Sequence, residues 1–217
     1  MKTLLVPLAV VSLLTGCATI NHTPLAKDAS QQLQGKTLAV AQHPIPDFAA
    51  FTAGKAAFAL IGALAMIAEG NAIIKDNAVP DPAVAIAEGL AEKLVSARAM
   101  KAGPLGKVAQ DDKLDALVAA NPGADYIVDV KTLNWMFNYY PSNWSHYRVS
   151  YSARVRLIDA ARKSVVAESA CQTVQGDDAK PPTKDDLLKA NAALLKAYLQ
   201  KGAAACVDVL GKDVLRM

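Results

Sequence analysis

Hydrophobic and polar residues alternate most clearly in the C-terminal half of the chain. Along residues 147–158, one face carries Tyr147, Val149, Tyr151, Ala153, Val155 and Leu157, and the other carries Arg148, Ser150, Ser152, Arg154 and Arg156. This period of two predicts a strand with one buried and one solvated face. Further strands are predicted at 37–41, 126–135 and 164–171, separated by turn-forming residues. We therefore expect the last three strands to form an antiparallel meander.

Helical patterns occupy much of the remaining chain. Asp81 and Pro82 suit the N-cap and first position of a helix, and Thr183 with Asp186 resembles a capping box that starts a long C-terminal helix. We expect that helix to break at Gly202, and we expect a shorter helix at 112–120. The predicted fold class is α+β: a mixed sheet with an antiparallel C-terminal meander, covered by helices on one face.

The segment 48–74 has an unusual pattern, because Lys55 is the only charge between Phe48 and Ala68. A helix that is apolar on every side is buried in the core, packed in an oligomer or in contact with lipid. Its 13 residues from Ala56 to Ala68 would give about 20 Å, which is short of the roughly 30 Å hydrocarbon core. We favour intermolecular or membrane contact, since other helices can cover the sheet. The candidate contact residues are Phe58, Leu60, Ile61, Leu64 and Ile67.

The N-terminus has the features of an export signal. Lys2 precedes a short apolar run from Leu4 to Leu14, and the next residues are Thr15, Gly16 and Cys17. This sequence resembles the lipobox of bacterial lipoprotein precursors, which implies cleavage before Cys17 and a diacylglyceryl group on its thiol. The alternative is an ordinary signal peptide with a chance cysteine. Ala18, in place of aspartate, favours the outer membrane by resemblance to the enterobacterial sorting rule.

These features predict three regions: a signal peptide at 1–16, a lipidated cysteine with a flexible tether at 17–36, and a single periplasmic domain at 37–217. Cleavage leaves 217 − 16 = 201 residues, which is enough for one domain with a core. Loss of Lys2 changes the formal net charge from +3 to about +2. This near-neutral charge gives no reason to expect a nucleic-acid partner.

Two cysteines remain once Cys17 is assigned to lipid. In an oxidising compartment, Cys171 and Cys206 are predicted to form a disulfide, with two buried free thiols as the alternative. The bond would close a loop of about 35 residues and contribute on the order of 3 kcal/mol.

Aromatic residues gather around the predicted turn at 141–143. This cluster consists of Trp135, Phe137, Tyr139, Tyr140, Trp144 and Tyr147, and it holds both tryptophans of the chain. Cross-strand aromatic pairs would stabilise a hairpin. The functional alternative is a binding surface for a protein, a glycan or lipid headgroups, because Trp and Tyr suit partly wet interfaces.

Residue patterns for catalysis are scarce. His22, His43 and His146 are not spaced as metal ligands, and no phosphate-binding loop is present, so we expect no metal and no cofactor beyond the lipid on Cys17. Ser145 and His146 are neighbours on a predicted strand and should point to opposite faces. Asp111 and Asp112 are expected to be solvated. The chain is therefore not expected to be an enzyme.

Two stretches resemble a known superfamily. Gly123-Ala124-Asp125-Tyr126-Ile127-Val128 is similar to a strand entry of the curli-secretion lipoprotein superfamily, and the segments 154–159 and 163–166 are similar to its hairpin. Related domains occur in penicillin-binding-protein activator lipoproteins and in the N-terminal domain of the Tol-system translocation protein. The resemblance covers about half of the mature chain, and it implies a binding or assembly protein. The secretion channel's inserts span the membrane as hairpins, but segment 48–74 lacks the alternation of a β-barrel strand.

The resulting expectation is a non-catalytic lipoprotein on the periplasmic side of the outer membrane that binds or scaffolds another envelope component. The alternative is an oligomerising auxiliary subunit of an envelope transport or secretion system. The expected partners are the membrane, through the lipid, and either an envelope protein or further copies of this chain.

Overall fold

A computed structural model describes residues 20–56 and 59–217. The described elements are α1 (Lys27–Gln31), β1 (Thr37–Val40), β2 (Ala49–Phe51), α2 (Ala53–Ala56), α3 (Ala59–Asp76), α4 (Pro82–Arg98), β3 (Lys101–Ala102), α5 (Leu114–Ala120), β4 (Tyr126–Tyr140), β5 (Asn143–Asp159), β6 (Ser164–Gln175) and α6 (Lys184–Asp213). The predicted signal peptide, Cys17 and Phe58 lie outside the described residues. None of the described helices combines the length and hydrophobicity that a bilayer span requires.

The sheet is mixed, with strand order β3-β1-β4-β5-β6. β4, β5 and β6 form the antiparallel meander, while β1 lies parallel to both β3 and β4. β2 also lies parallel to β4, opposite Met136–Asn138, whereas β1 lies opposite Tyr126–Val128. The chain between β1 and β2 therefore leaves the edge of β4 and returns to it farther along. This topology confirms the predicted fold class.

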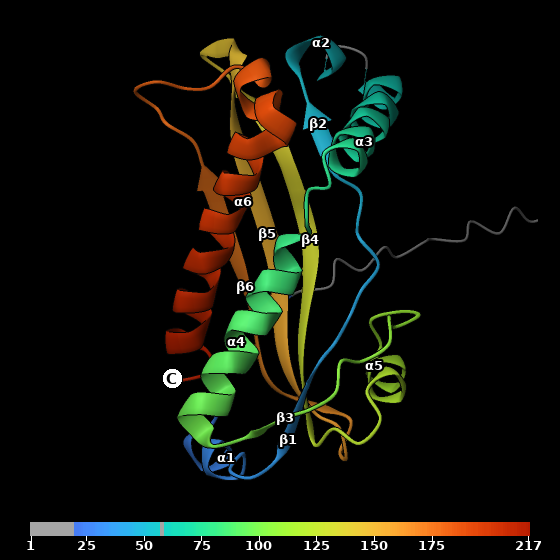
Figure 1. Ribbon diagram of the computed structural model, residues 1–217, viewed down its shortest axis with the longest axis vertical. Coiled ribbons are helices and arrows are strands. Elements are labelled where there is room, and N and C mark those ends of the chain that lie inside the picture. The colour runs from blue at the N-terminus through green and yellow to red at the C-terminus, as the bar shows by residue number, and fades with distance from the viewer. Residues whose placement is uncertain (1–19, 57–58) are drawn as a thin grey trace, which may run out of the picture.

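Helices α4 and α6 cover one face of the meander (Figure 1). Their caps match the prediction: Asp81 accepts a hydrogen bond from the Ala83 N–H, and Thr183 and Asp186 form a complete capping box. The core face of β5 carries the predicted apolar set from Tyr147 to Leu157, and each of its residues is buried. The opposite face is covered at one end by α5, which packs Leu117 against Ile127 and Ile158.

The break in α6 differs from the expected position. Gly202 is helical and buried, and it allows close packing on β6, because a Cβ there would lie 2.6 Å from Thr173 Oγ1. The helical geometry is instead interrupted at Lys189–Ala192, where Ala190, Asn191 and Ala192 have φ of 51°, 59° and 56°. Three left-handed residues in succession separate the capping-box turn from the long part of α6.

The prediction of a flexible tether at 17–36 is wrong for residues 23–36. Thr23 exchanges two backbone hydrogen bonds with Glu168 of β6, at 2.7 and 2.9 Å. Leu25 and Leu33 are fully buried in the main core, and α1 lies between them in the sequence. Their burial provides the free energy that orders this polar segment. The domain thus begins near residue 23.

The predicted disulfide between Cys171 and Cys206 is present, with an S–S distance of 1.97 Å. It joins β6 to the long part of α6, and both cysteines are buried. The bond therefore fastens a covering helix to the edge strand of the meander.

Candidate functional site

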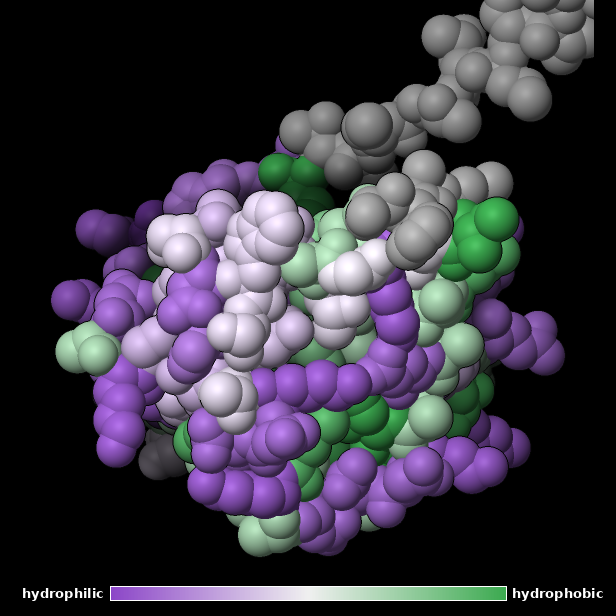
Figure 2. All heavy atoms as spheres, turned by 90° about the horizontal axis from the view of Figure 1, so that it is seen from above, coloured by the Kyte–Doolittle hydropathy of each residue, from purple (hydrophilic) through white to green (hydrophobic). Residues whose placement is uncertain are grey.

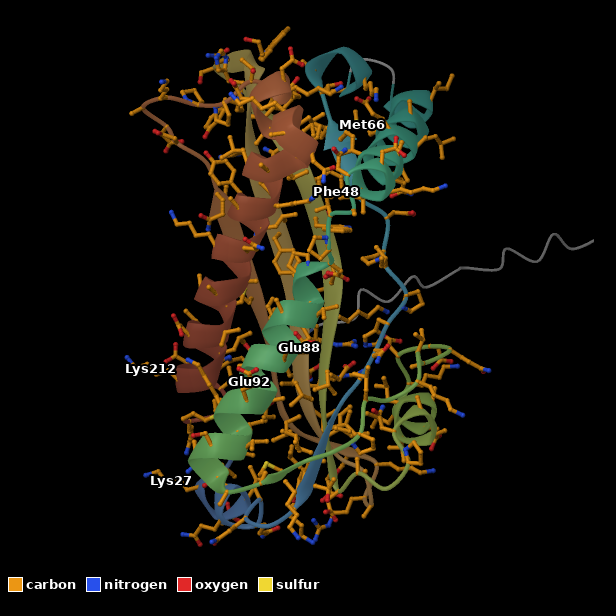
Figure 3. The ribbon with its side chains drawn as sticks, in the orientation of Figure 1. Lys27, Phe48, Met66, Glu88, Glu92 and Lys212 are labelled. Atoms are coloured by element: carbon orange, nitrogen blue, oxygen red, sulfur yellow. A yellow bond between two sulfur atoms is a disulfide. The ribbon has the colours of Figure 1, made fainter. Side chains whose placement is uncertain are left out.

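Segment 48–74 divides into a packed side and an exposed side. Met66 of α3 and Phe48, just before β2, are buried where α3 meets the sheet (Figure 3). A Cβ at Gly70 would lie 1.9 Å from the carbonyl oxygen of Phe48, so only glycine permits this approach. The packed side of the segment therefore belongs to the core, the alternative to the favoured intermolecular or membrane contact.

Apolar residues are exposed along the N-terminal part of α3. Ile61 and Leu64 are 79% and 68% exposed, and Ala63, Ala65 and Ala68 are exposed as well. We call these five residues the α3 surface. It lies at the end of the molecule that also carries α2 and the β4–β5 turn, where green hydrophobic residues reach the surface among purple hydrophilic ones (Figures 1 and 2). Ile67 is partly buried, and the side chain of Leu60 is outside the described set.

The α3 surface is held on the domain by charge as well as packing. Glu69 of α3 forms salt bridges with Lys55 of α2 and Lys184 at the start of α6. Burial, followed by the neighbouring charge of Lys184, lowers the pKa of Lys55. The two bridges tie α2 and α3 to α6, so the exposed apolar side chains project from a fixed support.

The aromatic cluster is not a single surface. Trp135, Phe137 and Tyr147 are buried, and Phe48 packs edge-on against Trp135 at a ring-centroid distance of 5.1 Å. The Trp135 indole N–H donates to the carbonyl of Asp47 at 3.0 Å. These three residues belong to the core, so the alternative that they form a binding surface is wrong for them. The hypothesis of a hairpin stabilised by cross-strand aromatic pairs describes them better, since Phe137 of β4 packs edge-on against Tyr147 of β5.

The remaining aromatic residues lie nearer the turn. Trp144 is 67% exposed, and its indole N–H donates to the carbonyl of Pro141 at 2.9 Å. Tyr139 and Tyr140 are partly buried; the Tyr139 ring lies between Phe51 and Trp144, stacked on the first and edge-on to the second. Burial raises the pKa of Tyr140. Of the six predicted residues, Trp144 alone is largely free to touch a partner.

A cluster of six ionisable residues lies on the sheet face opposite α4 and α6. We call it the charged cluster, and its members are His43, Asp112, Asp129, Lys131, Arg154 and Arg156. The Asp129 carboxylate is fully buried; His43 Nε2 lies 2.5 Å and Arg156 Nε 2.8 Å from its oxygens. Burial alone would raise the pKa of Asp129, but His43 and Arg156 together bring it below its usual range.

Asp112 completes the charged cluster from the loop before α5. Lys131 Nζ lies 2.9 Å and Arg154 Nη2 3.2 Å from its carboxylate. The hydrogen bond from Lys131 is the main reason that the pKa of Asp112 falls to about 2. The prediction that Asp112 is merely solvated is therefore wrong. The alternation of residues along β4 and β5 could have predicted that Asp129 and Arg156 share a face. No local sequence pattern predicts that His43 and Asp112 join them.

A hydrogen-bonded network of Asp81, Thr132 and Tyr151 lies beside the charged cluster. The Thr132 hydroxyl donates to Asp81 at 2.5 Å and lies 3.1 Å from the Tyr151 hydroxyl. Burial raises the pKa of both Asp81 and Tyr151. These groups fix the start of α4 to the centre of the sheet. Since these polar groups form hydrogen bonds with one another, their role is structural.

Among the described residues, no group of His, Cys, Asp and Glu side chains has the geometry of a metal site. Ser145 Oγ lies 3.0 Å from His146 Nδ1, which corrects the expectation that they diverge; both side chains also meet Asn143 Oδ1. The contact arises because the three residues lie at the turn between β4 and β5. The contact is exposed to solvent.

Comparisons with known proteins give limited information. No protein-family model matches the chain, and no curated protein matches it significantly. Among solved structures, PelC from Paraburkholderia phytofirmans, a dodecamer, matches with a TM-score of 0.35 and 14% identity, over 92% of this chain and 99% of that one. Protein CT253 from Chlamydia trachomatis gives 0.41 and 12%, over 82% and 96%. Lipoprotein GNA1162 from Neisseria meningitidis gives 0.29 and 11%, over 78% and 99%. At these values the similarities identify neither a family nor a function.

Proposed function

We propose that this protein is a non-catalytic lipoprotein, anchored through Cys17 to the periplasmic side of the outer membrane, that binds another envelope component through the α3 surface. The observation that carries the proposal is the exposure of Ile61 and Leu64 on a helix whose other side is packed. Leaving two large aliphatic side chains in water forfeits roughly 1.5–3 kcal/mol each relative to burial. A partner surface would recover that free energy.

Two further features support an envelope location. The N-terminal sequence contains the lipobox-like residues Leu14, Thr15, Gly16 and Cys17. Cys171 and Cys206 form a buried disulfide, a bond that persists in oxidising compartments such as the periplasm. The anchor and the bond together favour export over residence in the cytosol.

Replacement of Ile61 and Leu64 by lysine tests the binding role. We expect the double variant to remain folded, because both side chains already face water, and to lose its partner in crosslinking from intact cells. The matched control is Val174→Lys with Val209→Lys, which changes two exposed valines far from α3 in the sequence. If the Ile61/Leu64 variant keeps the same crosslinked partner as the wild type, the α3 surface is not the binding site.

Self-association is the second candidate, since an exposed aliphatic surface can also pack against the same surface of another copy. Light scattering on the purified full chain separates the two candidates. A wild type larger than a monomer, with the lysine double variant reduced to the monomer mass, supports an oligomerising auxiliary subunit. A monomeric wild type that still crosslinks to another protein supports the partner-binding role.

Cys17→Ala tests the anchor. The thiol is the proposed acceptor of the diacylglyceryl group, so we expect the variant to accumulate as an uncleaved precursor without lipid. Metabolic labelling with an alkyne fatty acid measures this directly, and Cys171→Ala serves as the cysteine control that keeps its label. Label that persists on the Cys17→Ala protein would contradict lipidation at this residue.

A further inference from the structure

A groove lies between α4 and the edge of the sheet at β1 and β3. Two cavities of about 230 and 390 Å³ form it, and they share Val40, Glu88 and Leu105 in their linings. We call this feature the α4 groove. Leu38 and Val40 belong to its floor, Ala91 and Val95 to its α4 wall, and Leu105, which is 74% exposed, to its outer wall.

The outer wall exists because the chain after β3 leaves the sheet edge. The Gly103 N–H donates to the Leu38 carbonyl at 2.7 Å, and the Ala109 N–H donates to the Gln42 carbonyl at 3.0 Å. Between these two bonds, Pro104 and its neighbours bulge away from β1, since proline has no N–H to continue the ladder. The bulge opens the edge of β1 beside Val40.

The rim of the α4 groove is acidic. Glu88 and Glu92 are exposed and lie one turn apart on α4 (Figure 3). No lysine or arginine lines either cavity, and within residues 20–56 and 59–217 no salt bridge involves Glu88 or Glu92. Like charges four residues apart on a helix destabilise it by about 0.2–0.5 kcal/mol. The pair therefore opposes folding slightly and presents two uncompensated charges to any occupant.

We propose that the α4 groove binds an extended peptide segment of another protein in which apolar and basic side chains alternate. Alternation suits the site, because successive side chains of an extended segment point to opposite sides. Apolar side chains would lie on Val40 and Leu105 while basic ones reach Glu88 and Glu92. The α4 stripe from Val84 to Val95 spans about 17 Å at 1.5 Å per residue, which is the length of about five extended residues. The α4 groove is separate from the α3 surface, so either binding proposal can be refuted while the other stands.

The test uses the full chain in a non-ionic detergent and a fluorescein-labelled hexapeptide of alternating leucine and lysine, with detergent alone as the background. We expect saturable binding by fluorescence anisotropy that weakens at high salt, since exposed charge pairs are screened. The double variant Glu88→Lys with Glu92→Lys should bind about tenfold more weakly, because two exposed ion pairs are lost. Leu105→Ser should weaken binding severalfold through loss of apolar contact.

The control Asp28→Lys with Asp76→Lys makes the same charge change on two other helices and should bind the peptide like the wild type. Should the lysine double variant unfold, Glu88→Gln with Glu92→Gln removes the charges without reversing them. The proposal is overturned if the wild type shows no saturable binding, or if the glutamate variants bind as tightly as the wild type. It is also overturned if a leucine–glutamate or a serine–lysine hexapeptide binds equally well.

Discussion

Asp129→Ala is expected to lower the free energy of unfolding by about 3–5 kcal/mol, the usual result of removing one partner from a buried ion pair. Arg156 is itself buried, and the substitution leaves its guanidinium without the carboxylate that lies 2.8 Å away. His43 loses its contact at the same time. Urea denaturation followed by circular dichroism measures the change. A loss below about 1 kcal/mol would show that the charged cluster does not hold the two strands together.

The same variant should alter the dependence of stability on pH. The pKa of Asp129 and that of Asp112 are lowered in the folded protein, so each carboxylate adds stability above its unfolded pKa of about 4. The contribution of Asp112 disappears as the pH falls from about 4 towards about 2, its folded pKa. Because the pKa of Asp129 is also lowered, the gap in stability between wild type and Asp129→Ala should narrow as the pH falls below about 4. Asp208→Ala is the control, because its pair with Lys93 is exposed and worth about 1 kcal/mol or less.

Loss of the Cys171–Cys206 disulfide should lower the free energy of unfolding by about 3–4 kcal/mol. The bond closes a loop with a sequence separation of 35 residues and so restricts the unfolded chain. Cys171→Ala with Cys206→Ala removes it with little change in the packing of two buried side chains. Denaturation in urea, with and without a reductant, measures the effect.

The reductant supplies the internal control for this experiment. Wild-type protein should become less stable once reduced, whereas the double-alanine variant should give the same denaturation curve in both conditions. Equal stability of oxidised and reduced wild type would mean that the bond adds nothing to the fold. Non-reducing mass spectrometry of protein expressed in the periplasm would show whether the two cysteines are joined there.

The sequence predicts well where one local rule acts without competition. Alternation along 147–158 identifies the buried face of β5, because a strand with one covered face must follow a period of two. The caps at Asp81 and Thr183 are also correct, since capping depends on residues within one turn. Parity and compartment are enough to pair Cys171 with Cys206.

The sequence does not predict features that depend on contacts between residues far apart in the chain. Leu25 and Leu33 stand alone in a polar stretch, and nothing in the neighbouring sequence shows that they join the main core. His43 and Asp112 join the charged cluster only because two loops return to the same part of the sheet. The apolar character of segment 48–74 is evident in the sequence, but its division into a packed and an exposed side depends on Gly70 and Phe48 meeting in space.

The backbone pairing of Thr23 with Glu168 sets a limit on how the domain can stand at a membrane. With lipid on Cys17, as proposed, six Cα–Cα steps separate the anchor from Thr23 and can span at most about 22 Å. Glu168 pairs with Arg156 of β5, which is 13 residues from Asn143 at the other end of that strand, or about 43 Å. The link is therefore about half as long as the distance from its attachment point to the β4–β5 turn. With so short a link, Trp144 cannot reach the leaflet that holds the lipid when the strands lie perpendicular to the membrane. In that orientation the β4–β5 turn points away from the membrane, into the periplasmic space.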